Sequence, residues 1–249
     1  MSLHTRLLLA ALSAGLLSST LPAAAASHWE YTGDKGATHW GEIDPSFAAC
    51  ASGHEQSPIN IVKTVKAALP ALAFHYGNAA PTIWNNGHTV QVTLPAGNTL
   101  EVGGQSYELL QFHFHTPSEE HIQGKSLPMV AHFVHRNAAG ELGVVAVLIR
   151  AGRSNAAWDS VFQHLPRVGE KITVDELSLD LGALLPKSLG YYDFAGSLTT
   201  PPCSEGVHWM VLKEPVTLSS RQIAAFRQLV GRNARPVQAL NARVVQESE

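Results

Sequence analysis

The segment Gln111-Phe112-His113-Phe114-His115 alternates strictly between polar and aromatic side chains. Successive side chains of a β-strand point to opposite faces of the sheet. The two phenylalanines therefore enter one core, whereas Gln111, His113 and His115 share the other face. Two histidines on one face stand about 7 Å apart at the backbone, and their rings can converge on one metal ion. The alternation predicts a strand that carries a candidate metal site.

A third histidine would complete such a site, and the segment 131–135 offers two of them. His132 and His135 are three residues apart, so they face opposite sides of a strand and only one can join the site. A lone His-x-His pair is weak evidence, since most histidines are structural. Three histidines without a cysteine favour catalytic over structural zinc, because three protein ligands leave one position for water.

The neighbouring sequence predicts more strands. Residues 89–94 alternate polar and apolar side chains, and residues 142–149 form a valine-rich apolar run typical of a central strand. The turn residues 137–140 predict a hairpin between residues 130–135 and this run. Residues 207–212 predict a further strand.

Helical patterns are few. Residues 154–165 place their large apolar side chains on one helical face. Ser219 and Gln222 form a capping box before a second apolar periodicity, and Gly231 predicts its end. Without a repeat or linker, the pattern predicts one mainly β domain with short peripheral helices.

Composition excludes several classes of protein. Of the 249 residues, 45% are hydrophobic and 15% charged, which excludes intrinsic disorder. The formal net charge of −3 provides no basic field, so we expect no nucleic-acid partner.

The first 26 residues read as a secretory signal. Residues 7–17 are apolar apart from Ser13, and small residues with an A-x-A pattern end at Ala26. A membrane anchor is the alternative, but this run is too short to cross about 30 Å of hydrocarbon. We therefore expect cleavage near Ala26, a mature chain of residues 27–249, and no membrane span.

The expected export bears on whether the two cysteines form a disulfide. Cys50 and Cys203 allow only one pairing, and an exported protein meets an oxidising compartment. Two buried free thiols are the alternative. A disulfide would close a very long loop, which the chain-entropy model values at about 4 to 5 kcal/mol as an upper figure.

Several motifs together resemble the α-class carbonic anhydrases, in order along the whole mature chain, and the export signal resembles their bacterial exported (periplasmic) branch. The motifs are Gln56-Ser57-Pro58-Ile59-Asn60, Asn85-Asn86-Gly87-His88, residues 111–115, Ser118-Glu119-Glu120-His121, residues 132–135, residues 196–203, Trp209, and Asn233-x-Arg235-Pro236.

The resemblance implies a twisted, mostly antiparallel sheet of about ten strands and a zinc-dependent lyase that hydrates carbon dioxide reversibly to bicarbonate. One zinc ion per chain would be bound by His113, His115 and His132. His135 and His121 would then be buried structural histidines. The bacterial branch would be periplasmic or secreted and compatible with a homodimer.

The resemblance also implies roles around the metal. Thr199 would orient the nucleophile and donate a hydrogen bond to Glu120, and Thr200 would help to seat bicarbonate. His88 would shuttle protons, with Tyr31 and Asn86 ordering a water chain. The remaining implied residues are Gln111 and Asn233, which would support the ligands and the water network, and Val134, Val144, Leu198, Val207 and Trp209, which would line an apolar wall for carbon dioxide.

One departure from the family pattern concerns the third ligand. Val130 stands where the family usually has a glutamate, two residues before His132 and on the same strand face. A metal-bound histidine usually donates its second ring proton to a carboxylate or carbonyl. Valine cannot accept it, so either another group substitutes or zinc is held less tightly. We expect the second in part, with Val130→Glu slowing zinc loss.

Two other functions compete with this one. A catalytically silent binding domain of the same family would typically have lost a zinc histidine, and this chain has all three. A zinc-dependent esterase would need a second carboxylate base, so we expect ester hydrolysis only as a side activity. Anions and sulfonamides would be the expected inhibitors.

Overall fold

The strand that carries His113 and His115 is the C-terminal part of β8 (Gln105–His115), which lies inside a 13-stranded sheet. The computed structural model describes residues 27–249, so the expected signal of residues 1–26 lies outside the described residues. Ten strands form one continuous order, which matches the expected size of the sheet. In that order they are β12 (Lys171–Thr173), β5 (Thr82–Asn85), β6 (Val90–Thr93), β8, β10 (Met129–Asn137), β11 (Leu142–Ala151), β15 (Glu205–Leu212), β14 (Tyr191–Ser197), β17 (Gln246–Ser248) and β2 (Val65–Ala67).

The sheet is mixed rather than purely antiparallel. β11 runs parallel to β15 and to β16 (Val216–Leu218), and β17 runs parallel to β2. The other pairs of this sheet are antiparallel, including β7 (Thr99–Val102) with β8 and with β3 (Ala73–His75). Two small ladders lie outside it, β1 (Asn60–Ile61) with β9 (His121–Ile122) and β4 (Asn78–Ala79) with β13 (Leu179–Asp180).

The predicted hairpin is confirmed. β10 and β11 pair antiparallel from Met129–Ile149 to Arg136–Leu142, and the backbone N–H of Gly140 closes the turn on the carbonyl of Asn137. β10 also pairs with β8, and this register sets His132 directly opposite His113.

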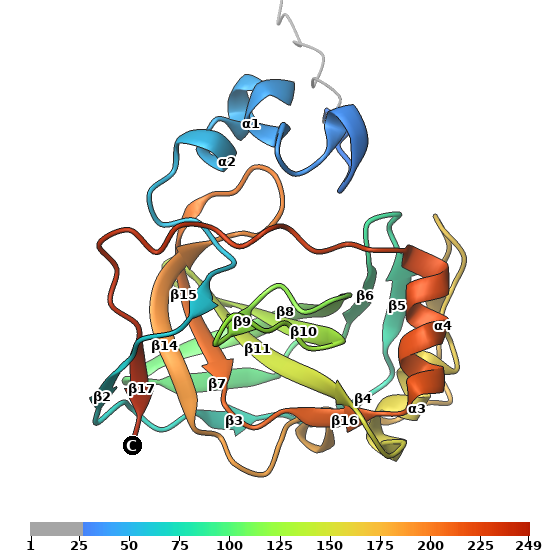
Figure 1. Ribbon diagram of the computed structural model, residues 1–249. Coiled ribbons are helices and arrows are strands. Elements are labelled where there is room, and N and C mark those ends of the chain that lie inside the picture. Colours follow the sequence, from blue (N-terminus) through green and yellow to red (C-terminus); the bar gives the residue numbers. More distant parts are fainter. Residues whose placement is uncertain (1–26) are drawn as a thin grey trace, which may run out of the picture.

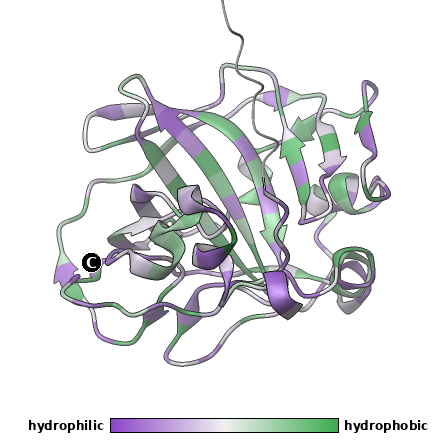
Figure 2. Cartoon of the chain, turned by 90° about the horizontal axis from the view of Figure 1, so that it is seen from above, coloured by the Kyte–Doolittle hydropathy of each residue, from purple (hydrophilic) through white to green (hydrophobic). Residues whose placement is uncertain are grey.

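The two faces of the sheet pack into two separate apolar cores. Phe112 and Phe114 enter the larger core together with Trp158 and Phe226. Val130 and Val134 enter the smaller one, on the same face as His132. Figure 2 shows hydrophobic and hydrophilic residues interspersed along the strands. The strand alternation in the sequence thus places the aromatic side chains on one side and the histidines on the other.

Helices cover the periphery of the sheet. α1 (Trp40–Ile43) and α2 (Ala49–Ser52) lie beyond one end of it, and α3 (Ala156–Phe162) and α4 (Ser220–Val230) lie together at one side (Figure 1). Three short 3₁₀ turns complete the described elements, at Gly33–Lys35, Pro45–Phe47 and Gly182–Leu184. No helix of residues 27–249 has the length and apolar character needed to cross a membrane.

One predicted helix is shorter than expected. α3 begins at Ala156 because the Asn155 side chain accepts a hydrogen bond from the Ala157 N–H, and it ends at Phe162 instead of Leu165. The His164 ring bonds to the carbonyl of Ser160, which takes the place of a further helical turn. α4 follows the prediction: both bonds of the Ser219–Gln222 capping box are present, and Gly231 ends the helix with a φ of 77°.

Candidate metal centre

Three histidine rings meet on one face of the sheet. His113 and His115 project from β8, and His132 projects from the opposite position on β10. Ring centroids are 4.9 Å apart for His113–His115, 5.5 Å for His113–His132 and 4.7 Å for His115–His132. One nitrogen of each ring lies within 4.8 Å of the others, close enough to share one metal ion.

Each ring has one nitrogen already engaged by an acceptor. His113 Nδ1 donates to Gln111 Oε1 at 2.8 Å, and His115 Nδ1 donates to the carbonyl of Asn233 at 2.8 Å. His132 Nε2 donates to Glu120 Oε1 at 2.9 Å. These acceptors fix the tautomer of each ring. The nitrogen left with a free lone pair is Nε2 in His113 and His115 and Nδ1 in His132, and such an arrangement is usual for metal-bound histidines.

Burial keeps the β8 histidines neutral. It lowers the pKa of His113 to about 3 and lowers that of His115 as well, with His132 adding to both shifts. His115 Nε2 is buried without a hydrogen-bond partner among the described residues. Burial also acts to lower the pKa of His132, but the carboxylates of Glu120 and Glu119 outweigh it and raise the pKa. A set of imidazole nitrogens with an orphaned buried atom fits a zinc ion.

The expected pairing of Thr199 with Glu120 is wrong. The buried neighbour of Thr199 is Glu119: burial raises the pKa of Glu119 to about 7, and the Thr199 hydroxyl is one of the groups that oppose this rise. Glu119 Oε1 also accepts the backbone N–H of Arg235 at 2.8 Å. Both glutamates lie on the bend between β8 and β9, where strand alternation no longer says which side chain faces which partner. The sequence shows the two adjacent carboxylates, but it does not show that Glu119 faces Thr199 and Glu120 faces His132.

The loop that carries Thr199 is fastened by several contacts. The backbone N–H of Leu198 donates to the carbonyl of Ser204, and that of Cys203 donates to the carbonyl of Thr200. Trp209 Nε1 donates to the carbonyl of Ser197 at 3.0 Å. Thr199 is buried, whereas Thr200 is half-buried. The loop is therefore held at both ends, next to the histidines.

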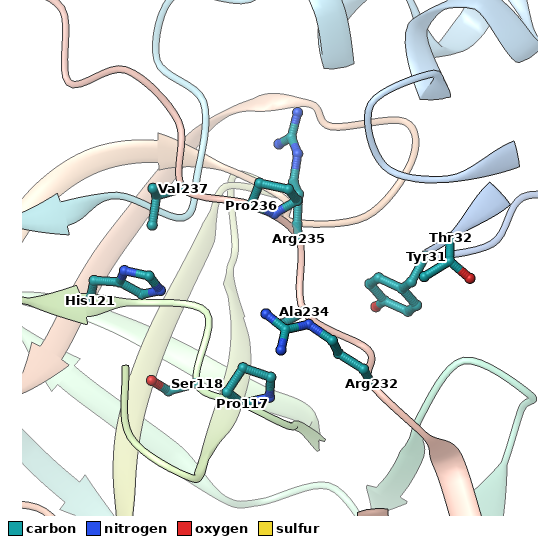
Figure 3. Close-up of a pocket in the computed structure, with 10 residues that line it drawn as sticks. All are labelled: Tyr31, Thr32, Pro117, Ser118, His121, Arg232, Ala234, Arg235, Pro236 and Val237. Atoms are coloured by element: carbon teal, nitrogen blue, oxygen red, sulfur yellow. The ribbon is translucent and has the colours of Figure 1, made fainter. Parts of the chain in front are cut away.

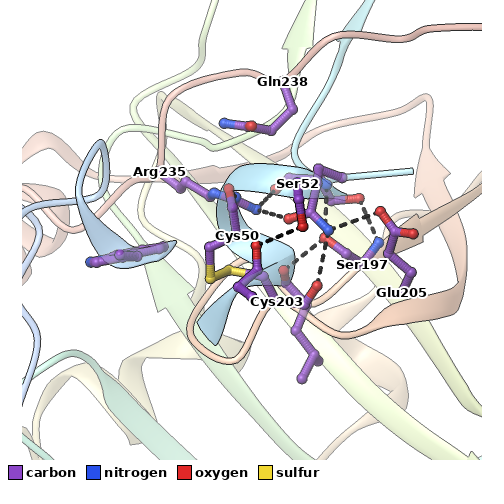
Figure 4. Close-up of a disulfide and its surroundings, with 12 residues drawn as sticks. Cys50, Ser52, Ser197, Cys203, Glu205, Arg235 and Gln238 are labelled. Carbon is purple, nitrogen blue, oxygen red and sulfur yellow. Dashed lines mark hydrogen bonds between the residues drawn. A yellow bond between two sulfur atoms is a disulfide. The ribbon is translucent and has the colours of Figure 1, made fainter. Parts of the chain in front are cut away.

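The predicted disulfide is confirmed at the end of this loop. Cys50 and Cys203 are bonded, with Cα atoms 5.0 Å apart and a sequence separation of 153. Gln56 Nε2 donates to the Cys203 carbonyl at 2.9 Å, and Arg235 Nη2 donates to the Cys50 carbonyl (Figure 4). The bridge joins α2 to the Thr199 loop.

The residues expected to form an apolar wall lie together. The smaller core contains four of them and the fifth packs against it; they are Val134, Val144, Val207 and Trp209, with Leu198 at the edge. The indole of Trp209 lies 4.9 Å from the His132 ring. Apolar surface thus adjoins the histidines.

His88, the expected proton shuttle, packs against an aromatic neighbour. Its half-buried ring stacks on Trp29, with centroids 3.8 Å apart. Trp29 lies in no motif that could have predicted this contact. Burial lowers the pKa of His88, and the charge of His28 lowers it further, while Glu30 acts in the opposite direction. Asn86 Oδ1 accepts the backbone N–H groups of His88 and Thr89, so this side chain supports the turn.

Asn233 and Tyr31 are two further residues that were expected to support the site. Asn233 Nδ2 donates to the carbonyls of His88 and Phe114, which ties the His88 turn to β8. Burial raises the pKa of Tyr31 well above its ordinary value, and the charge of Glu119 adds to the rise. Tyr31 therefore stays protonated near Glu119.

His135 and His121 differ from each other. His135 is buried on the opposite face of β10 and contacts the hydroxyl of Tyr76 at 2.6 Å, as expected of a structural histidine. His121 is only half-buried and lines a cavity of about 330 Å³ with Tyr31 and Arg232, whose side chain extends toward the middle of the group (Figure 3). The expectation of a buried His121 is therefore wrong.

The fold and the three histidines define a β-sheet protein with a candidate metal site beside an apolar wall. Residues 35–249 match the family described as eukaryotic-type carbonic anhydrase. A carbonic anhydrase of Neisseria gonorrhoeae is 47% identical over 238 residues, which cover 93% of this chain and 94% of the relative.

Solved structures give the same result. The α-carbonic anhydrase from Thermovibrio ammonificans, solved with the inhibitor sulfanilamide, superposes with a TM-score of 0.87 at 42% identity and covers 89% of this chain and 100% of its own. The Photobacterium profundum α-carbonic anhydrase gives 0.84 at 47% identity, covering 88% of this chain and 100% of its own. The chain belongs to the α-class carbonic anhydrases and is a carbon dioxide-hydrating enzyme of the bacterial type.

Proposed function

We propose that the chain hydrates carbon dioxide reversibly at one zinc ion held by His113, His115 and His132. The observation that carries this proposal is the set of three converging rings, each with its second nitrogen hydrogen-bonded to an acceptor. When bound there, zinc supplies the Lewis acidity that activates water near neutral pH, the chemistry for which carbonic anhydrases are the standard example. Neutral imidazoles suit this task because they leave the full positive charge of the ion in place.

Thr199 orients the attacking oxygen in this proposal. In the proposed arrangement the Thr199 hydroxyl, which acts to lower the pKa of Glu119, donates to that buried carboxylate and leaves its oxygen lone pair free to accept a hydrogen bond from the nucleophile. Glu119 is held in turn by the backbone N–H of Arg235. Thr200, at the half-buried end of the same loop, helps to seat bicarbonate.

The apolar wall serves the substrate. Carbon dioxide carries no net charge and forms only weak hydrogen bonds, so apolar surface competes with water for it. Val134, Val144, Val207 and Trp209 offer that surface beside the histidines, with Leu198 at its edge. The product, bicarbonate, is an anion that apolar surface does not stabilise, so the wall does not retain it.

His88 carries the proton out of the site. It is half-buried, Asn233 ties its carbonyl to that of Phe114 on the strand of His113 and His115, and a histidine titrates close enough to neutral pH to accept and release protons. Its lowered pKa favours release of the proton to solvent.

The chain is exported in this proposal, with residues 1–26 as the signal. The disulfide supports this location, because disulfides persist in oxidising compartments. Sulfonamides and anions would inhibit by competing for the metal position, as sulfanilamide is an inhibitor in the Thermovibrio structure.

The proposed reaction is tested with two measurements on the purified chain. We expect one zinc ion per chain by elemental analysis and fast carbon dioxide hydration by stopped flow, with only slow hydrolysis of activated esters. Bound zinc without hydration would indicate the silent binding domain, and ester hydrolysis that outpaces hydration would indicate an esterase.

Replacing His88 by alanine should slow turnover in weak buffer by about 10-fold or more, since positioned proton-transfer groups typically contribute about 10²-fold or more. The carbon dioxide step, measured by isotope exchange at equilibrium, should stay nearly unchanged. Imidazole added to the buffer should restore much of the rate. His39→Ala, at an exposed histidine, is the matched control; if imidazole restores nothing, another group is the shuttle.

A further inference from the structure

The carboxylate that contacts His132 comes from an unexpected position. The family usually supplies a glutamate from β10 at the position of Val130, and here the acceptor is Glu120, from the bend before β9. We propose that Glu120 is the positioning residue of the third metal ligand: it holds the His132 ring so that Nδ1 faces the metal. This inference rests on the proposed function, since it assigns a task to Glu120 only if His132 binds zinc.

The carboxylate of Glu120 makes its hydrogen bond to His132 alone among the described residues. His132 Nε2 and Glu120 Oε1 are 2.9 Å apart, and both side chains are almost fully removed from solvent. The other oxygen, Glu120 Oε2, is buried without a hydrogen-bond partner among the described residues. His132 is therefore the only hydrogen-bonding partner of this carboxylate within residues 27–249.

The bend that carries Glu120 is anchored on both sides. Ser118 Oγ donates to the Glu120 carbonyl at 2.9 Å and accepts the backbone N–H of Leu127 at 2.9 Å. The backbone N–H of His121 donates to the carbonyl of Ile59, in the ladder next to the bend. These bonds fix the Glu120 backbone, so its side chain presents the carboxylate at a defined place.

Val130 contributes to apolar packing and offers no acceptor for the His132 ring proton. It is fully buried in the smaller apolar core with Val134 and Ala146. A glutamate at 130 would compete with Glu120 for one ring N–H, and one of the two carboxylates would stay buried and unpaired, which is costly. Of the two alternatives that the sequence left open at position 130, the structure therefore favours the first, in which another side chain accepts the His132 ring proton. In place of the expected slower zinc loss, we expect Val130→Glu alone to bring no gain.

The test measures zinc dissociation from the holoenzyme into excess chelator. Glu120→Ala should speed zinc loss by about 10- to 100-fold, the usual effect of losing a partner that orients a metal ligand. Glu120→Gln, whose amide oxygen still accepts the ring proton, should lie between wild type and Glu120→Ala. Glu176→Gln, at an exposed glutamate, is the matched control and should match wild type.

A relocated carboxylate separates positioning from mere packing. Val130→Glu alone should leave zinc loss unchanged or faster, whereas Val130→Glu combined with Glu120→Ala should recover at least part of the wild-type retention. Nuclear magnetic resonance of the zinc-loaded protein gives a second readout: the His132 Nε2 proton should exchange slowly with water in wild type and rapidly in Glu120→Ala.

Two outcomes would overturn the inference. Zinc loss from Glu120→Ala within twofold of wild type would leave Glu120 without a positioning role, even if the protein were less stable. Slower zinc loss in Val130→Glu alone would mean that the ring proton had no adequate acceptor. A wild-type protein with no zinc would overturn the proposed function itself, a result distinct from either.

Discussion

Replacing His132 by alanine is expected to remove zinc and to lower carbon dioxide hydration on the order of a thousandfold or more. A metal ion contributes several kcal/mol to the stabilisation of a transition state, and each 1.36 kcal/mol is about tenfold in rate. His113→Ala and His115→Ala should have the same effect. The measurements are zinc content and stopped-flow hydration, with the fold followed by circular dichroism and largely retained.

His135→Ala is the matched control for this prediction. His135 lies on the same strand, three residues away, and its ring points into the opposite core against Tyr76. Its loss should lower the melting temperature more than the zinc content. Full hydration activity in His132→Ala would refute the proposed metal site.

Removing the bond between Cys50 and Cys203 should cost up to about 5 kcal/mol of unfolding free energy. In the chain-entropy model the cost grows with the length of the closed loop, which here spans 153 residues. Chemical denaturation of the Cys50→Ser/Cys203→Ser variant and of reduced wild type measures it. Hydration should fall more than zinc content, because the bridge fastens the loop with Thr199 rather than the histidines.

The controls for the disulfide are simple. Reduced wild type and the double variant should agree, because both lack the same bond. Two thiols that titrate in the native, unreduced protein would contradict the bridge.

The sequence predicted those parts of the site that depend on strand periodicity. Alternation along residues 111–115 sets His113 and His115 on one face, and the three-residue spacing of His132 and His135 separates them. The capping box of α4 was equally local and was predicted with its bounds. These features depend on near neighbours in the chain, which a sequence displays directly.

The parts that the sequence did not predict depend on bends and distant contacts. Glu119 and Glu120 are adjacent, and only the bend before β9 decides that one faces Thr199 and the other His132. The acceptor behind His115 is the carbonyl of Asn233, 118 residues away. Sequence periodicity does not reveal such contacts. The valine at position 130 therefore suggested that His132 lacks a carboxylate partner, whereas the fold supplies Glu120.

The anchoring of the Thr199 loop also sets the order in which a newly synthesised chain can complete its site. His113 and His132 lie on strands close in sequence and can pair as soon as β10 is made. The loop is fastened to residues 50–57, and these are held by Arg235 and Arg243, which bond to the carbonyls of Cys50, Ser57 and Gln56. Contacts so distant in sequence form only when the C-terminal segment is available. A nascent chain that ends before residue 235 thus carries all three ligands, but the residues that anchor its threonine loop still lack these arginine contacts.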